Sequence, residues 1–113
     1  MNKKIKFKLK SKHWIVDNQN NIVFAKGRME ILEAIEQTGS INQAAKLLQM
    51  SYKSVWSKIK TTEKHLKSKV VHSDKKDGTQ LTSAGIALLT KFKQMNKECM
   101  AEDDRCFFKI FRD

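Results

Sequence analysis

The apolar residues near the N-terminus repeat at every second position, which is the spacing of a β-strand. Ile5, Phe7 and Leu9 alternate with lysines, and this pattern predicts a half-buried strand. The apolar runs 14–16 and 22–24 flank a polar turn, which predicts a β-hairpin. The lysine ladder has two interpretations, protection of a sheet edge or contact with nucleic acid, and both stay open.

From Arg28 onward the apolar spacing becomes helical. Ile31, Leu32 and Ile35 fall on one face, and Gly39 stands where a glycine commonly ends a helix. A second helix is predicted directly after it, with Ser40 as N-cap, Gln43 at the capping-box position and an apolar face formed by Ile41, Ala44, Ala45 and Leu48.

A third helix is predicted from Ser51, its N-cap, with an apolar stripe of Tyr52, Val55, Trp56, Ile59 and Leu66. Because Tyr52 and Trp56 share this stripe, we interpret them as core residues; Tyr52, near the helix start, is also a candidate for DNA contact. The opposite face carries lysines and short hydroxyl side chains, at Lys53, Ser54, Ser57, Lys60, Thr61 and Lys64.

A short hairpin is predicted after the third helix. Val70, Val71 and Leu81 flank a polar tip that contains Lys75 and Lys76. We interpret this hairpin as a wing. Its two lysines either meet DNA phosphates or form an ordinary solvated turn.

A long C-terminal helix is predicted from Thr82 or Ser83. Its large apolar residues continue close to the C-terminus, where one chain has little to cover them, so we expect a dimer interface formed by Ile86, Leu89, Phe92, Met95, Cys99, Cys106 and Ile110. Packing back onto the same chain is the alternative. A second alternative concerns the polar segment 101–105, which either continues the helix or breaks it.

Positive charge is concentrated in two segments. The chain has a formal net charge of +11, residues 1–26 carry seven lysines and one aspartate, and residues 41–68 carry six lysines and one glutamate. The intervening segment 27–40 is acidic, with one arginine and three glutamates. Charge confined to particular elements indicates a polyanionic partner.

Two helices joined by a short turn, of which the second is basic, are typical of a helix-turn-helix. The third helix would then lie in the DNA major groove, with its N-terminal residues at base edges and later lysines at phosphates. The predicted DNA-binding residues are Ser40, Gln43, Ser51, Tyr52, Lys53, Ser54, Ser57, Lys58, Lys60, Thr61, Lys64, Lys75 and Lys76.

Other classes of protein find little support in the sequence. No segment approaches the about 20 apolar residues of a membrane span, so we expect a cytoplasmic protein without a membrane partner. Cys99 and Cys106 lack metal-ligand spacing, and we expect buried, reduced thiols, with pairing between subunits as the alternative. We find no constellation of catalytic residues and expect neither enzymatic activity, nor a metal, nor a cofactor.

The segment GRMEILEAIEQTGSINQAAKLLQMSYKSVW, followed by LTSAGIALL, resembles the N-terminal DNA-binding domain of the ModE-type molybdate-responsive regulators. The matching motifs are TGSI, MSYKSVW and LT..G, a framework found more loosely in LysR-type regulators. The resemblance covers about residues 14–95. It implies a winged-helix homodimer that binds a palindromic operator, with Ser51, Tyr52, Lys53 and Trp56 in the motif.

The chain departs from this family in two places. Full-length members carry C-terminal oxyanion-binding domains, which the residues after the resemblance are too few to form, so this chain gives no support for the sensing of molybdate or another effector. SDKKDG replaces the glycine-rich wing of the family, so we expect different wing contacts.

We therefore predict an α+β, mainly α fold, a winged helix-turn-helix with an N-terminal β-hairpin and a long C-terminal dimerisation helix. The parts of this single domain, residues 1–113, are N-terminal strands (1–26), a three-helix core (28–66) with the helix-turn-helix (40–66), the wing (69–82) and the dimer helix (83–113). The predicted function is a bacterial or archaeal transcriptional regulator that binds double-stranded DNA as a homodimer through helix 51–66. The alternatives are a protein-interaction module and a sequence-tolerant nucleoid or RNA-binding protein.

Overall fold

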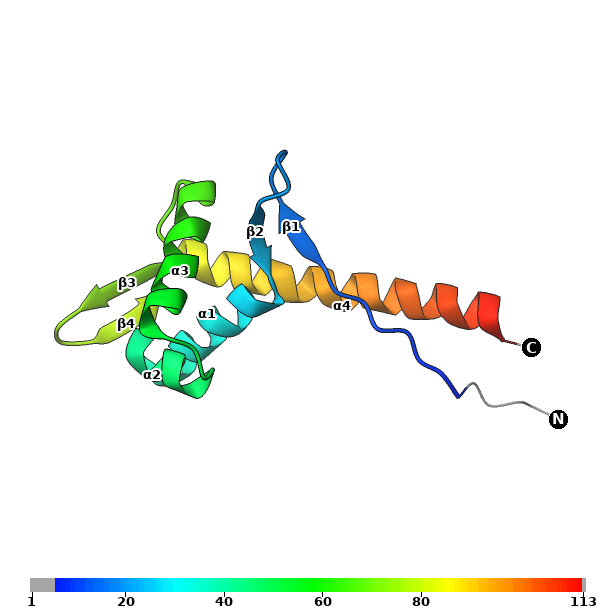
Figure 1. Cartoon of the computed structure of the whole chain (residues 1–113), viewed down its shortest axis with the longest axis horizontal. Coiled ribbons are helices and arrows are strands. Elements are labelled where there is room, and N and C mark those ends of the chain that lie inside the picture. Colours follow the sequence, from blue (N-terminus) through cyan, green and yellow to red (C-terminus); the bar gives the residue numbers. More distant parts are fainter. Residues whose placement is uncertain (1–5, 113) are drawn as a thin grey trace.

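The computed structural model describes residues 6–112, and within them the predicted winged helix-turn-helix fold is confirmed. Its elements, shown in Figure 1, are β1 (Trp14–Val16), β2 (Ile22–Ala25), α1 (Lys26–Thr38), α2 (Ile41–Leu47), α3 (Tyr52–Leu66), β3 (Val71–Asp74), β4 (Gly78–Leu81) and α4 (Ser83–Phe111). The strands form two separate antiparallel hairpins, β1–β2 and β3–β4.

The core lies where α1, α2 and α3 meet the first half of α4. Phe24 of β2 completes it and packs edge-on against Phe92 of α4, with ring centroids 5.0 Å apart. The buried apolar residues of the helices are Ile31, Leu32, Ala34, Ile35, Ile41, Ala44, Ala45, Val55, Ile59, Leu89 and Phe92. The helical spacing read from the sequence therefore identified the core faces of α1 and α2.

The predicted signals between the first three helices act as caps. Gly39 has a φ of 71° and its N–H donates to the carbonyl of Ile35, so α1 ends there. The Ser40 hydroxyl accepts a hydrogen bond from the Gln43 N–H at 3.1 Å, and the Ser51 hydroxyl accepts one from the Ser54 N–H at 3.0 Å. These caps allow the helices to follow one another with very short connections.

The start of α4 is locked to the base of the wing, the β3–β4 hairpin. The Thr82 hydroxyl accepts from the Gly85 N–H at 3.0 Å and donates to the Lys69 carbonyl at 2.6 Å. The Thr82 N–H donates to the Val70 carbonyl at 3.0 Å. A Cβ atom at Gly85 would overlap this same carbonyl, so the glycine of the LT..G motif permits the close approach of backbone to helix.

The strand predicted around Phe7 and Leu9 is not present. Residues 6–13 form no strand, and the Phe7 side chain is 78% exposed; Ile5 lies outside the described residues. The segment has no strand partner, because β1 pairs only with β2, and it leaves the hairpin alongside α4 (Figure 1). It is held there by a 2.8 Å hydrogen bond between His13 Nδ1 and Asn96 Oδ1. Alternation of lysine with apolar residues does not make a strand where no neighbour supplies hydrogen bonds.

The α4 helix runs unbroken for 29 residues, so segment 101–105 does not interrupt it. Two of the residues assigned to a dimer interface, Leu89 and Phe92, are instead buried in the core of the chain itself. The expectation of buried thiols is wrong for Cys106, which is exposed, and Cys99 is only partly buried. The C-terminal part of α4 extends past the other helices (Figure 1), and the contacts made there, such as those of His13 with Asn96 and Asp103, do not cover Cys106.

Candidate nucleic-acid interface

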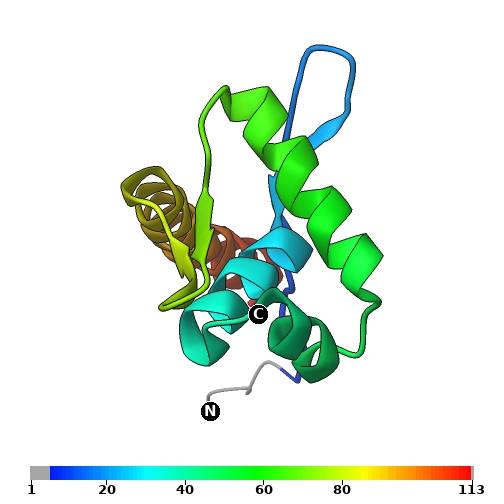
Figure 2. The same ribbon diagram turned by 90° about the vertical axis from the view of Figure 1, so that its left-hand side faces the viewer.

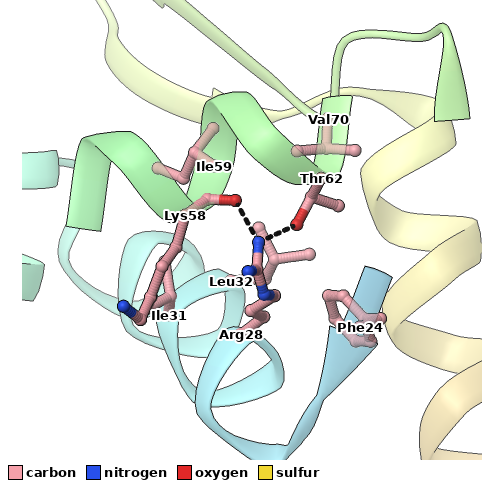
Figure 3. Close-up of a pocket in the computed structure, with 8 residues that line it drawn as sticks. All are labelled: Phe24, Arg28, Ile31, Leu32, Lys58, Ile59, Thr62 and Val70. Atoms are coloured by element: carbon pink, nitrogen blue, oxygen red, sulfur yellow. Dashed lines mark hydrogen bonds between the residues drawn. The ribbon is translucent and has the colours of Figure 1, made fainter. Parts of the chain in front are cut away.

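The α3 helix is fastened to α1 by a partly buried arginine. Arg28 donates to the Lys58 carbonyl at 2.7 Å and to the Thr62 hydroxyl at 3.0 Å, as Figure 3 shows. Burial lowers the pKa of the Arg28 guanidinium, which still stays charged. The surrounding side chains leave a cavity of only about 10 Å³, too small for a ligand. This partly buried contact therefore helps to set the position of α3.

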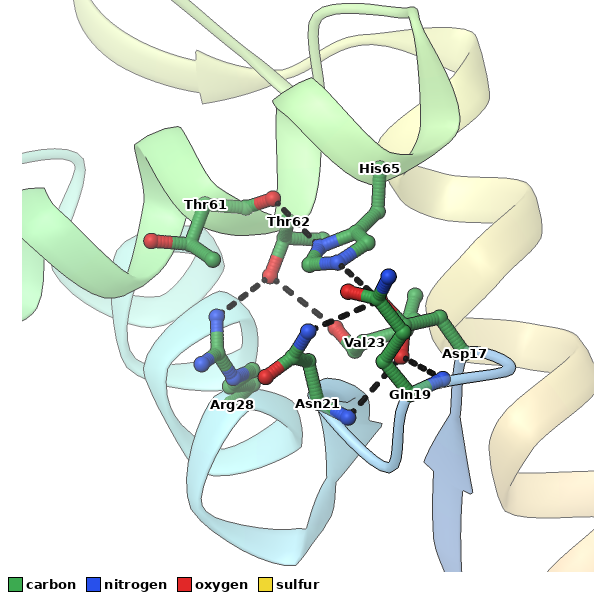
Figure 4. Close-up of polar contacts among 8 residues, drawn as sticks. All are labelled: Asp17, Gln19, Asn21, Val23, Arg28, Thr61, Thr62 and His65. Atoms are coloured by element: carbon green, nitrogen blue, oxygen red, sulfur yellow. Dashed lines mark hydrogen bonds and ion pairs between the residues drawn. The ribbon is translucent and has the colours of Figure 1, made fainter.

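The turn of the β1–β2 hairpin holds the C-terminal end of α3. The Asp17 carboxylate accepts from the backbone N–H groups of Asn21 and Gln19, which lowers its pKa to about 2 (Figure 4). It also lies 3.2 Å from Nε2 of His65, whose Nδ1 lies 3.0 Å from the Thr61 carbonyl. His65 therefore links the turn of the hairpin to the last turns of α3.

The wing is attached to the opposite side of α3. The carboxylate of Glu63 is nearly buried and accepts from the Val70 N–H at 2.8 Å and the Val71 N–H at 3.4 Å. Its other oxygen lies 3.3 Å from Lys60 Nζ. Since Glu63 bonds to the first residues of the wing, it fixes the angle between α3 and the wing.

The α3 helix carries eight of the thirteen side chains predicted to bind DNA. Lys53, Ser57, Lys60 and Lys64 are exposed on this helix, Gln43 is exposed in the first turn of α2, and Ser51 is exposed at the N-cap of α3. The remaining predicted residues of this surface, Ser40, Ser54, Lys58 and Thr61, are partly buried. Figure 2 shows the ribbons of α3 and the wing together, with α4 receding behind them.

Several of the hydroxyls predicted to contact bases already have partners within the chain. The Ser40 and Ser51 hydroxyls accept the cap hydrogen bonds, and Thr61 donates to the Ser57 carbonyl at 2.8 Å. Lys58 Nζ lies 3.5 Å from the Ser54 hydroxyl. Lys53, Lys64 and Ser57 are therefore more available to an incoming partner than these four hydroxyl groups.

Tyr52 and Trp56 are exposed, and the interpretation of both as core residues is wrong. Tyr52 is 50% exposed and Trp56 is 44% exposed, whereas Val55 and Ile59 on the same helix are buried. The apolar stripe of α3 is wider than the face that its neighbours cover. The lysine at position 60 lies over the Trp56 ring, with Nζ 5.1 Å from its centroid.

The tip of the wing is ordered by Asp74. Its carboxylate accepts from the backbone N–H groups of Lys76 and Asp77, which lowers its pKa. The Thr79 N–H donates to the Gly39 carbonyl at 2.9 Å, which ties the wing to the end of α1. Lys75 and Lys76 are exposed at this ordered tip.

Two other kinds of site were sought over residues 6–112. No group of three or more histidine, cysteine or acidic side chains there is placed to hold a metal ion. None of the helices in the same range is long and apolar enough to cross a membrane.

Comparison with known proteins gives consistent matches. Residues 27–86 match the family of bacterial regulatory helix-turn-helix proteins of the lysR type. Over 82 residues the chain is 37% identical to the molybdenum transport protein ModE of Azotobacter vinelandii, covering 69% of this chain and 30% of that protein. The solved CbnR_DBD–DNA complex has a TM-score of 0.58 at 22% identity, covering 71% of this chain and 91% of that one. ArgP from Mycobacterium tuberculosis has a TM-score of 0.53 at 26% identity, covering 68% and 27%.

These matches concern the winged helix-turn-helix. The chain spans less than a third of the length of ModE and of ArgP. The structural likeness to CbnR supports the fold, and the identity to ModE confirms the resemblance expected from the TGSI, MSYKSVW and LT..G motifs. The matched residues 27–86 make up more than half of the chain, from α1 to the start of α4. The chain therefore belongs to the lysR family of bacterial regulatory helix-turn-helix proteins.

Proposed function

We propose that this protein is a transcriptional regulator that binds double-stranded DNA sequence-specifically, with α3 in the major groove. The observation that carries the proposal is the set of exposed lysines on α3 and on the tip of the wing, namely Lys53, Lys64, Lys75 and Lys76. The CbnR_DBD in the solved CbnR_DBD–DNA complex has the same fold, which supports DNA as the partner. Lysines on α3 and on the wing suit contacts to phosphates on the two sides of one groove.

A homodimer accounts for the exposed half of α4. Phe108, Ile110 and Phe111 are exposed beyond the domain, and association of two such helices would remove this apolar surface from water. A twofold dimer places two α3 helices on a palindromic operator with half-sites about 10–10.5 base pairs apart. The operator would then mirror the symmetry of the protein.

The test is selection of the purified protein against fragmented genomic DNA at about 150 mM salt, where weak phosphate binding is suppressed. We expect enrichment of an inverted repeat, and contact with six to ten phosphates predicts a loss of about 10³–10⁵ in affinity between 50 and 200 mM salt. Salt-dependent binding without enrichment would instead indicate the sequence-tolerant alternative. Absence of DNA binding would leave the protein-interaction alternative.

Single substitutions on α3 separate base contacts from phosphate contacts. Lys53→Ala, at the N-terminal end, should change which operator bases are preferred. Lys64→Ala, three turns further along, should weaken binding to all sequences alike and reduce the salt slope by about one. The opposite assignment of the two effects would mean that α3 lies in the groove in another register.

A further inference from the structure

Two large aromatic side chains lie on the exposed surface of α3, where the core does not need them. Tyr52 and Trp56 are 50% and 44% exposed and lie one helical turn apart at the start of the helix. By contrast, the aromatic pair of the core, Phe24 and Phe92, is buried almost completely. An exposed aromatic pair on a basic helix is unfavourable for solubility unless a partner covers it.

Trp56 is also held in place by a chain of contacts. Lys60 Nζ lies 5.1 Å from the centre of its ring and 3.3 Å from the carboxylate of Glu63. Glu63 is in turn fixed by the backbone N–H of Val70, at 2.8 Å. The indole is therefore oriented before any ligand arrives, on the side of α3 that faces the base of the wing.

The chemistry of the major groove contains one group that suits such a surface. Base edges there present hydrogen-bond donors and acceptors, and their one apolar group is the C5-methyl of thymine. Lysine and serine side chains can address the polar positions. The hydroxyl of Tyr52 and the indole N–H of Trp56 lie at the ring edges, whereas the faces of the two rings are apolar. An oriented indole at the entrance of the groove matches a methyl group.

We propose that Tyr52 and Trp56 form a surface that reads a thymine methyl group, with Trp56 as the principal specificity-determining residue. This inference rests on the proposed function, because it requires α3 to lie in the major groove. Lys60 then acts as a positioning residue for the indole, which explains why its charge is shared with Glu63 instead of being free for a phosphate.

The experiment replaces thymines of the selected operator, one position at a time and symmetrically in both half-sites, by deoxyuridine. This exchange removes only the methyl group. Burial of one methyl is worth a change of about fourfold in affinity, so a symmetric exchange should weaken binding by about 15-fold at the contacted position. The other thymines should show little effect.

The same operators are then measured with Trp56→Ala. We expect this variant to bind the thymine and deoxyuridine operators equally, while Trp56→Phe restores part of the difference. Trp14→Ala is the matched control, because Trp14 is the other tryptophan of the chain and is also exposed, on β1, and it should retain the full difference. Circular dichroism and thermal unfolding of each variant verify that the fold is intact.

The outcomes separate this inference from the function on which it rests. If no operator is enriched in the genomic selection, the proposed function itself fails. If an operator is bound but no thymine methyl matters, or if Trp56→Ala keeps the wild-type sensitivity to deoxyuridine, the reading of thymine by Trp56 is overturned and the regulator stands.

Discussion

Both halves of α4 carry large apolar side chains, but their surroundings differ. In the first half, Leu89 and Phe92 are buried by α1 and β2, and Phe92 is only 2% exposed. In the second half, Phe108 and Phe111 remain 46% and 67% exposed on a helix that has left the domain (Figure 1). The difference is set by the reach of the neighbouring elements, because a helix of 29 residues extends about 43 Å, further than the small core.

This comparison shows what an amphipathic stripe does and does not specify. Helical spacing of apolar residues predicts that one face will be covered. It does not say whether the cover belongs to the same chain or to another one. The first half of α4 thus contributes to the core of the chain, and the second half is available for association with another chain.

The largest effect should come from the buried half. Phe92→Ala removes the ring that packs against Phe24 and should lower the free energy of unfolding by about 3–5 kcal/mol, as measured by urea denaturation. Phe108→Ala is the matched control on the same helix, and at concentrations where the protein is monomeric it should change stability by less than about 0.5 kcal/mol. Equal losses in the two variants would show that the halves of α4 do not differ.

Association should respond in the opposite way. The double change Phe108→Ala and Phe111→Ala removes two exposed aromatic rings from the proposed dimer interface. The dimer would then lose about 3 kcal/mol of the association free energy that comes from apolar burial. This loss would weaken dimerisation by roughly 100-fold, which sedimentation equilibrium can measure. Lys109→Ala lies between them and serves as control. Unchanged association in the double variant would exclude this part of α4 from the interface.

The junction of α4 with the wing offers a third test. Gly85→Ala adds a methyl group that overlaps the Val70 carbonyl, so the backbone must shift at a cost of about 1–3 kcal/mol in thermal unfolding. Gly27→Ala, in α1, has no neighbouring atom within 4 Å and should instead stabilise the protein by about 0.5–1 kcal/mol. A stabilised Gly85→Ala variant would mean that the start of α4 is not locked to the wing.

Local signals made much of the fold predictable. Gly39, Ser40 and Ser51 act on their own neighbours, so the turns between helices could be located from sequence. The wing followed from two short apolar runs and a polar tip for the same reason. The basic surface of α3 and the positions of Lys75 and Lys76 were also foreseen.

Features that depend on distant partners were not predictable. Tyr52 and Trp56 are not covered by the neighbouring helices, and the spacing of apolar residues does not predict how much of an apolar stripe is covered. Arg28 and Glu63 are polar residues with structural roles, and their partners are mainly backbone groups that no sequence pattern marks. A polar residue at a helix–helix contact, such as Arg28 opposite Thr62, would have been the only available hint.

The smallest expected effect is a change in the pH dependence of stability, and it arises in the β1–β2 hairpin, whose Phe24 packs against the buried half of α4. Asp17 organises the turn of the hairpin that carries Phe24, and its pKa is lowered from 3.8 to about 2, chiefly by the N–H of Asn21. A carboxylate with a lowered pKa stabilises the fold at pH values above its unfolded pKa and loses this contribution as the pH falls toward the folded one. Between pH 5 and about 2 the wild type should therefore lose more thermal stability than Asp17→Asn, which carries no titrating group at this position. Circular dichroism melts of the two proteins test this, with Asp104→Asn on the exposed half of α4 as control. If the melting temperatures of wild type and Asp17→Asn fall in parallel as the pH is lowered, protonation of Asp17 does not affect the stability of the fold. If Asp17→Asn differs from the wild type and Asp104→Asn does not, the acid-sensitive contact lies at the hairpin turn and not on the outer half of α4.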